Sequence, residues 1–208
     1  QEQHFVGLAA MYGCEKRIAQ KILQMIEAPI QHKISNATLY QSLQTNMDIE
    51  LNDDQQRAIM ACFSSKISII TGGPGTGKTT LIKTLLKLLN QHNFEYKLAA
   101  PTGRAAKRLM ESTKQHATTI HRLLEFDPAS MKFTHHEQNA LKTDFLIVDE
   151  TSMIDIFLGH SLLKAISLAS HVVFLGDVDQ LPSVGPGNVL KDCINSQKIS
   201  CTKLTQIF

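Results

Sequence analysis

The sequence predicts an α/β domain, a parallel sheet with helices on both faces, preceded by a small helical segment. From residue 51 onward, short apolar runs alternate with longer amphipathic ones, which is the pattern of alternating strands and helices. Two short runs, residues 145–148 and 172–175, are apolar at every position, as expected of strands buried on both faces. The length of 208 residues fits one domain with an appendage.

Residues 1–50 are predicted to form the helical segment. Ile18, Ile22 and Ile26 lie four residues apart with basic residues between them, which indicates an amphipathic helix that Pro29 ends. A second helix is expected over residues 36–43. We expect this segment to pack against the domain or to act as a linker, because it carries no chemical motif.

Residues 51–208 are predicted to form the sheet domain. Strands are expected over residues 67–70, 96–100, 145–148, 172–175 and 199–204. Helices are expected over residues 79–90, 104–114, 156–168 and 188–194. Residues 125–142 contain a turn sequence, Asp127-Pro128-Ala129-Ser130, and Phe133 as a strand or wedge residue.

Residues 72–79, Gly-Gly-Pro-Gly-Thr-Gly-Lys-Thr, fit the phosphate-loop pattern G-x-x-x-x-G-K-[ST] between a strand and a helix. Backbone N–H groups of such a loop converge on phosphate oxygens, and the helix N-terminus adds a positive dipole end. Lys78 is expected to reach the β- and γ-phosphates, and the Thr79 hydroxyl to bind Mg²⁺. The predicted ATP-binding residues of this loop are Gly73, Pro74, Gly75, Thr76, Gly77, Lys78, Thr79 and Thr80.

Polar side chains follow both fully apolar runs. Asp149 and Glu150 come first, at the strand edge where parallel α/β sheets bind ligands. Asp149 is expected to hold Mg²⁺, and Glu150 to orient or deprotonate the attacking water. Thr151 and Ser152 are candidate caps of the next helix, which leaves the carboxylates free for chemistry. After the next strand, Gln180 is a candidate for contact with the γ-phosphate.

Charge is segregated along the chain although the formal net charge is only +2. That small excess excludes a generally basic nucleic-acid coat, so a polyanion site must be local. Residues 101–124 hold five cations against one anion: Arg104, Lys107, Arg108, Lys114 and Arg122 against Glu111. Residues 143–180 hold six anions against one cation: Asp144, Asp149, Glu150, Asp155, Asp177 and Asp179 against Lys164.

The basic stretch has two interpretations. Arg104, Arg108 and Lys114 can share one helix face, which would suit a nucleic-acid backbone. The alternative is a solvated helix face with no ligand. In either case Ala105, Ala106, Leu109 and Met110 are expected to face inward.

The motifs together resemble superfamily 1 DNA helicases of the RecD-like type, the exodeoxyribonuclease V alpha-subunit family. Gln55 lies in a stretch similar to the Q motif, whose glutamine reads adenine. The other matching stretches follow in family order from motif I to the opening of motif IV: residues 71–80, 99–106, 117–124, 146–153, 175–187 and 204–208.

This resemblance implies a RecA-like P-loop NTPase domain, the first motor domain of a helicase that moves 5′ to 3′ on single-stranded DNA. It implies catalytic roles for Lys78, Asp149, Glu150 and Gln180. In the family, a hairpin inserted before motif II helps to split the duplex, and residues 125–142 occupy that interval. The implied DNA-binding residues are Pro101, Thr102, Gly103, Arg104, Arg108, Thr118, Thr119 and His121.

The chain starts at Gln1 and stops at Phe208, where motif IV would supply an arginine, so we expect a piece of a larger protein. Family members place ATP between two motor domains, and an arginine finger contributes on the order of 10³–10⁵ in rate. We therefore expect these residues alone to bind Mg-nucleotide weakly, to hydrolyse it very slowly and not to unwind DNA.

Expected partners are single-stranded DNA, duplex junctions and subunits of a recombination or repair complex. The alternative is a P-loop switch or clamp that binds ATP and a protein partner; it explains the phosphate loop but not the basic stretch. None of the four cysteines is in a C-x-x-C pair, which favours the cytoplasm. No apolar run approaches 18 residues, so no membrane span is expected.

Overall fold

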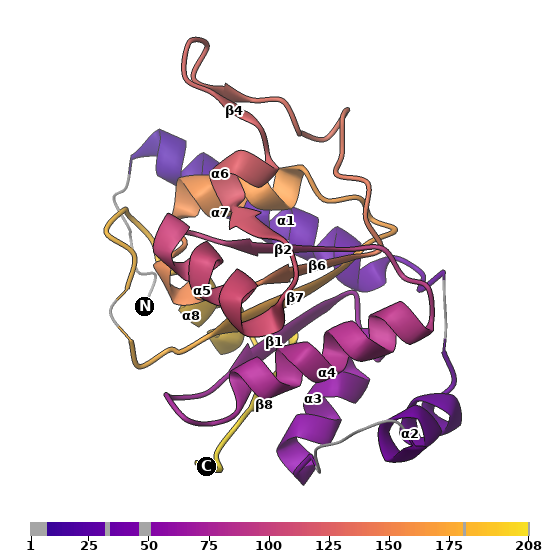
Figure 1. The fold of residues 1–208 in the computed structure, drawn as a ribbon. Helices are drawn as coiled ribbons and strands as arrows, with labels where there is room; N and C mark the ends of the chain where they lie inside the picture. Colours follow the sequence, from indigo (N-terminus) through magenta and orange to yellow (C-terminus); the bar gives the residue numbers. More distant parts are fainter. Residues whose placement is uncertain (1–7, 32–33, 46–50, 181, 208) are drawn as a thin grey trace, which may run out of the picture.

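The computed structural model describes residues 8–31, 34–45, 51–180 and 182–207. Figure 1 shows a central sheet between two layers of helices, with a hairpin that projects beyond them. The predicted α/β architecture with a parallel sheet is therefore confirmed. Within the described residues, no helix combines the length and the apolar character needed to cross a membrane.

The main sheet has six strands in the order β3-β2-β6-β7-β1-β8, and every neighbouring pair is parallel. All five predicted strands are present, with ends shifted by one residue at most. The sequence analysis did not predict β3, a three-residue edge strand. The strands are β1 (Ile67–Thr71), β2 (Tyr96–Ala100), β3 (Ala117–Thr119), β6 (Phe145–Val148), β7 (His171–Gly176) and β8 (Ser200–Lys203).

The helices cover both faces of this sheet. The sequence analysis assigned no helix to α3 or α6. The α-helices are α1 (Ala9–Glu27), α2 (Asn36–Thr45), α3 (Asp53–Ser64), α4 (Lys78–Gln91), α5 (Gly103–Thr113), α6 (Ile120–Leu123), α7 (Ile156–Lys164) and α8 (Val189–Asn195). The helix predicted over residues 156–168 is too long: α7 ends at Lys164, because the next residues pair with Leu141, whose N–H donates to the Ala165 carbonyl.

Alternate residues of the central strands belong to two hydrophobic clusters, one on each face of the sheet. In β6, Leu146 and Val148 belong to the cluster with α1, α6, α7 and α8, whereas Phe145 and Ile147 belong to the cluster with α2, α3, α4 and α5. This is the period of two that an extended strand imposes on its side chains. The sheet is thus buried on both faces, as its apolar strand sequences require.

The two N-terminal helices contribute to these same clusters. In α1, Ile18, Ile22 and Met25 are buried against the sheet and α7. The predicted buried face of α1 was wrong at Ile26, which is exposed. With 3.6 residues in each helical turn, Met25 lies on the buried face instead. The helix α2 buries Leu39 and Leu43 in the opposite cluster.

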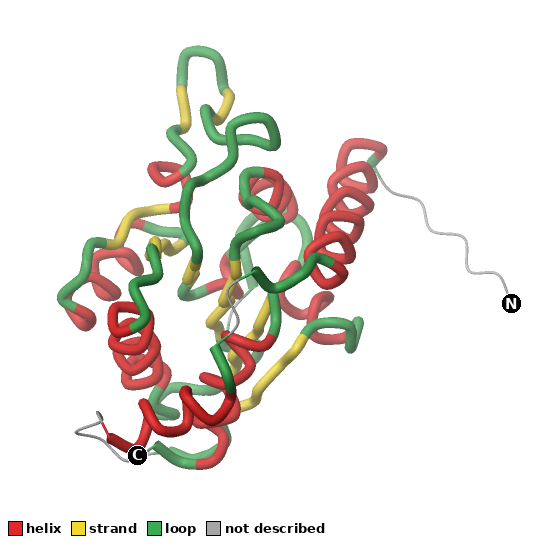
Figure 2. Tube along the Cα trace, turned by 90° about the vertical axis from the view of Figure 1, so that its right-hand side faces the viewer, coloured by secondary structure: helices red, strands yellow, loops and turns green. Residues whose placement is uncertain are grey.

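Residues between α6 and β6 form a small antiparallel pair, β4 (Phe126–Asp127) with β5 (Lys132–Phe133). The Asp127 carboxylate accepts from the Ala129 N–H at 3.0 Å and from the Ser130 hydroxyl at 2.7 Å, which closes the turn. These hydrogen bonds lower the pKa of Asp127. Figures 1 and 2, two views at right angles, both show this hairpin projecting away from the sheet.

Candidate functional site

The candidate nucleotide site lies where the parallel strands end. Because all six strands run in one direction, the segments after β1, β2, β6 and β7 start at the same edge of the sheet. The phosphate loop follows β1, and Asp149 follows β6. This edge is where open α/β sheets bind their ligands. The topology therefore brings the sequence motifs to one edge.

The phosphate loop has a backbone that requires glycine at two positions. Gly75 has φ +78° and Gly77 has φ +82°, a left-handed region that side chains disfavour. The Lys78 ammonium donates to the carbonyls of Gly72 at 2.5 Å and Gly73 at 2.9 Å, and thus lies inside the loop. The buried Thr76 hydroxyl donates to the Gly73 carbonyl at 2.8 Å, which fixes the loop's curvature.

The helix α4 begins at Lys78, so its free N–H groups face the loop. Thr79 is exposed and Thr80 is half-buried in its first turn, and neither hydroxyl is buried in the core. Pro74 is exposed at the tip of the loop. These residues follow one another through the loop and the first turn of α4, and their role in nucleotide binding stays a prediction.

The two carboxylates at the end of β6 differ in environment. Burial raises the pKa of Asp149 to about 6, and the nearby Glu150 charge also raises it, against the Glu150 N–H hydrogen bond and the Lys78 charge, which lower it. The Glu150 N–H donates to Asp149 Oδ1 at 2.9 Å. Glu150 itself has φ +54°, a left-handed backbone that is uncommon outside glycine. Such local strain is typical of functional sites.

The predicted capping of the helix after Glu150 was wrong. Thr151 and Ser152 are buried in a short 3-10 turn, where the Thr151 hydroxyl donates to the Leu175 carbonyl of β7 at 2.8 Å. Asp155 is the N-cap of α7 instead, and it accepts from the Leu158 N–H at 2.8 Å. Neither Asp149 nor Glu150 caps α7, because the 3-10 turn lies between them and the helix.

Residues after β7 form a loop that packs on this cap. The Ile156 N–H donates to the Pro186 carbonyl at 2.9 Å, and a Cβ on Gly185 would lie 2.3 Å from Asp155 Oδ2. Gly185 is therefore required for the close approach of the loop to α7. Gln180 is exposed near the start of the loop, whereas Leu181 lies outside the described residues.

The Q-like stretch is arranged as the start of α3. Gln55 is buried, and its Oε1 accepts from the Asn52 N–H at 3.2 Å while the Asn52 side chain accepts from the Gln55 N–H at 2.8 Å. This reciprocal pair is a capping box, which the Asn-x-x-Gln spacing could have predicted. In this structure the Gln55 side chain serves the helix start, so a role with adenine stays a prediction.

The segment after β8 joins that helix start. Thr205 donates to Asp54 from its N–H at 3.3 Å and its hydroxyl at 2.8 Å, which lowers the pKa of Asp54. Asn52 Nδ2 donates to Gln206 Oε1 at 2.9 Å. An open pocket of about 770 Å³ lies between the two segments. The sequence indicates both segments but not their contact, since about 150 residues separate them.

The candidate DNA segment after β2 begins with a capped helix. The Thr102 hydroxyl accepts from the Ala105 N–H at 3.2 Å, and Gly103, Arg104 and Arg108 are exposed on or at α5. Pro101 is half-buried beside them.

The predicted inward residues of α5 are correct in three cases, since Ala105, Ala106 and Leu109 are buried. The prediction was wrong for Met110, which is 40% exposed. It lies 100° around the helix from Leu109 and thus leaves the buried stripe.

The second candidate DNA segment links the sheet to the hairpin. Thr118 and Thr119 are half-buried at the end of β3, and the Thr119 hydroxyl accepts from the Arg122 N–H at 3.2 Å. The exposed His121 ring lies 5.7 Å from the rings of both Phe126 and Phe133. His121 therefore contacts the base of the hairpin.

The residues proposed for Mg²⁺ fit a nucleotide-bound ion. Among the described residues, no group of three or more His, Cys, Asp or Glu side chains could hold a metal by itself. Mg²⁺ beside a nucleotide needs few protein ligands, since phosphates and water supply the rest. The buried Asp149 carboxyl, with its raised pKa, is a group that an adjacent cation would return to its ionised form.

A parallel sheet of this strand order with a phosphate loop after β1 defines a P-loop domain of the RecA-like class. A family model described as an AAA domain matches residues 55–186, and the chain belongs to that family. The Pif1 helicase of Candida albicans shares the fold, with a TM-score of 0.58 at 23% identity over 77% of this chain and 41% of that chain.

Two curated relatives confirm the resemblance to RecD-like proteins. The chain is 40% identical over 166 residues to the RecBCD enzyme subunit RecD of Mycolicibacterium smegmatis, which covers 68% of this chain and 30% of the relative. It is 39% identical over 158 residues to the ATP-dependent RecD2 DNA helicase of Deinococcus radiodurans, which covers 76% of this chain and 22% of the relative. The chain spans less than a third of the length of these relatives.

Proposed function

We propose that this chain is the first motor domain of an ATP-dependent DNA helicase that moves 5′ to 3′ on single-stranded DNA. One observation carries the proposal: the acidic strand end and the basic segment lie on neighbouring strands. The Asp149 N–H donates to the Ala99 carbonyl of β2 at 3.0 Å, one residue before that strand ends. In this proposal, that hydrogen bond connects a change at the nucleotide to the segment that carries Arg104.

In this proposal each residue of the edge has one task. Lys78 and the α4 N-terminus stabilise the phosphate charge, and Glu150 accepts the proton of the attacking water. Thr79 and Asp149 would hold Mg²⁺, which supplies charge neutralisation at the β- and γ-phosphates. Gln180 contacts the γ-phosphate, and Gly185, further along the same loop, lies close to Asp155 at the start of α7.

The exposed cations of α5 hold the DNA backbone without reading its sequence, since phosphate contacts position a protein on nucleic acid. The RecD and RecD2 relatives, whose names include a DNA helicase and a subunit of RecBCD, support this assignment. They also support subunits of a recombination complex as partners. The four cysteines are free thiols, which supports the cytoplasm as the location.

The alternative function is a nucleotide-dependent switch that binds a protein partner. It accounts for the phosphate loop and for Asp149 and Glu150. The switch function gives no role to the exposed side chains of Arg104 and Arg108, so we rank it below the helicase function.

The deciding measurement is ATP turnover with and without single-stranded DNA, on a chain extended to the length of the relatives. Stimulation by DNA is expected, and a Lys78→Ala chain provides the blank because it loses the phosphate contact. An Arg104→Ala chain should lose affinity for single-stranded DNA equally for all sequences, with a salt slope flatter by about 0.7. Turnover that ignores DNA would favour the switch instead.

A further inference from the structure

A second basic site lies on the face of the sheet opposite α5. A pocket of about 360 Å³ opens between α1 and α7, and the segment after the hairpin completes its wall. Its charged lining consists of Arg17 and Lys21 from α1, His160 and Lys164 from α7, and Glu137 from that segment. Four basic side chains thus surround one pocket with a single acid.

Helix geometry explains why these side chains converge. Arg17 and Lys21 are four residues apart on α1, and His160 and Lys164 are four apart on α7, so each pair projects from one side of its helix. The two helices pack against each other through the buried Ile18, Ile22 and Leu163. The apolar contact therefore fixes two pairs of basic side chains on either side of one opening.

The positive charge of this pocket is offset only in part, by the Glu137 carboxylate in its lining. Across the described ranges, none of the four basic side chains forms an ion pair. Burial lowers the pKa of His160, and the charges of Arg17 and Lys164 lower it further. Burial also lowers the pKa of Lys21, partly offset by Glu137. Burial and nearby positive charge make it unfavourable to protonate these side chains without a ligand. Such a grouping of basic side chains is typical of an anion site.

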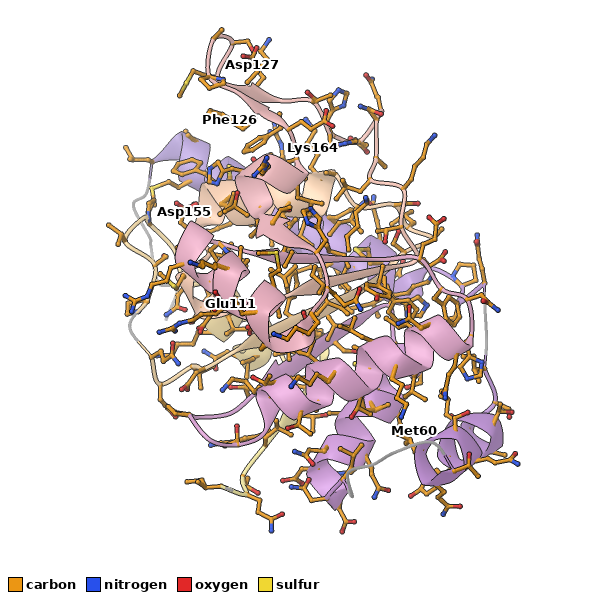
Figure 3. All side chains as sticks on the ribbon, in the orientation of Figure 1. Met60, Glu111, Phe126, Asp127, Asp155 and Lys164 are labelled. Carbon is orange, nitrogen blue, oxygen red and sulfur yellow. The ribbon has the colours of Figure 1, made fainter. Side chains whose placement is uncertain are left out.

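The pocket lies at the base of the hairpin. The chain that leaves β5 is tied to the hairpin root by the His135 N–H, which donates to the Leu124 carbonyl at 3.2 Å. It then passes Glu137 and reaches Leu141, which bonds to Ala165 next to Lys164. In Figure 3, Lys164 lies below Phe126 and Asp127 of the hairpin.

We propose that this pocket binds a backbone phosphate of DNA at a fork, on the side of the hairpin away from α5. The inference rests on the proposed helicase function and adds a second contact to it. The cations of α5 would hold the tracked strand, and this pocket would hold the strand that the hairpin turns aside. Free phosphate shares the same chemistry, so the test must separate the two ligands.

The test compares forked DNA with single-stranded DNA on the 208-residue chain. A Lys21→Gln/Lys164→Gln variant removes two cations from the pocket. A Lys16→Gln/Lys191→Gln variant removes two exposed cations that do not line it. We expect the pocket variant alone to flatten the salt slope of fork binding by about 0.7, the value of one lost phosphate contact on a separated strand. Its affinity for single-stranded DNA should equal that of the control.

A second measurement follows the His160 ring signals by NMR during titration with inorganic phosphate. Phosphate should shift them, and forked DNA should displace the phosphate. The affinity for forked DNA should rise as the pH falls through the His160 pKa. Protonation of His160 adds a positive charge beside Arg17, Lys21 and Lys164, which the Glu137 carboxylate opposes. Ring signals that ignore phosphate would overturn the anion site, and phosphate that DNA does not displace would overturn the DNA assignment.

The two proposals fail in different ways. Loss of the helicase proposal would appear as absent single-strand binding or as an Arg104→Ala variant that binds normally. Loss of the pocket proposal would leave single-strand binding intact, with fork binding equal in the pocket variant and its control.

Discussion

The nucleotide edge and the α1–α7 pocket are two candidate phosphate sites built in opposite ways. The phosphate loop uses consecutive residues 72–79, glycine-dependent backbone angles and the N-terminus of α4. The pocket uses side chains from Arg17 and Lys21 on one helix and from His160 and Lys164 on another, about 140 residues later. The comparison teaches that a site made of local backbone is visible in the sequence, whereas a site made of converging side chains is not.

The two sites also differ in how far their side chains are already fixed before a ligand binds. In the loop, the Lys78 ammonium is already bonded to two carbonyls, and Asp149 is already desolvated. The pocket holds cations on long side chains at the surface, which lose rotamer freedom when they bind. The loop is therefore suited to a precise reaction geometry, and the pocket to a tolerant backbone contact.

The largest expected effect is at the nucleotide edge. Glu150→Gln, in a chain extended to the length of the relatives, should keep ATP binding and lower turnover by about 10²–10⁴, because an amide cannot accept the proton. Fluorescent-nucleotide binding and phosphate release measure the two quantities. Fork binding through the α1–α7 pocket should not change. Normal turnover by a Glu150→Gln chain would show that this carboxylate does not take part in the reaction. The nucleotide edge would then no longer differ from the α1–α7 pocket as a site of chemistry.

An intermediate effect is expected at the hairpin that lies beside the pocket. Phe133→Ala removes ring contacts to Phe126 at 5.1 Å and His121 at 5.7 Å, each worth about 0.5–1.5 kcal/mol. In the extended chain, unwinding of forked DNA should fall by roughly tenfold, while DNA-stimulated ATP turnover stays unchanged. Phe133→Tyr keeps the ring and should restore unwinding. Equal loss of turnover would show that the hairpin and the nucleotide edge are not separable.

The smallest effect is expected at the start of α7, where the loop after β7 packs on Asp155. Asp155→Ala removes the cap of α7 and should lower the free energy of unfolding by about 0.5–2 kcal/mol, as measured by urea denaturation. Asp155→Asn can still accept from the Leu158 N–H, so its stability should match the parent chain. An alanine variant of full stability would mean that the packing of Gly185, not the cap, holds this region.

The sequence predicted the central strands because their burial on both faces needs apolar side chains at every position, as in residues 145–148. It failed to indicate α3, although the Asn52 and Gln55 spacing carried a cap signal that the resemblance to the Q motif obscured. It placed Met110 inside and the cap of α7 at Thr151 or Ser152. The first error concerns which side of a helix faces the core and the second where a helix begins, and contacts with neighbouring elements decide both.

By itself, the sequence determined the phosphate loop, the acidic strand end and the parallel α/β class, because each depends on neighbouring residues or on a repeating pattern. Tertiary structure alone decided the contact of Thr205 with Asp54, the packing of His121 on the hairpin and the basic pocket. Lys164 shows the reason. It is the one cation in an acidic stretch of sequence, yet α7 carries it to the cations of α1, since charge interactions depend on distance in space and not on distance along the chain.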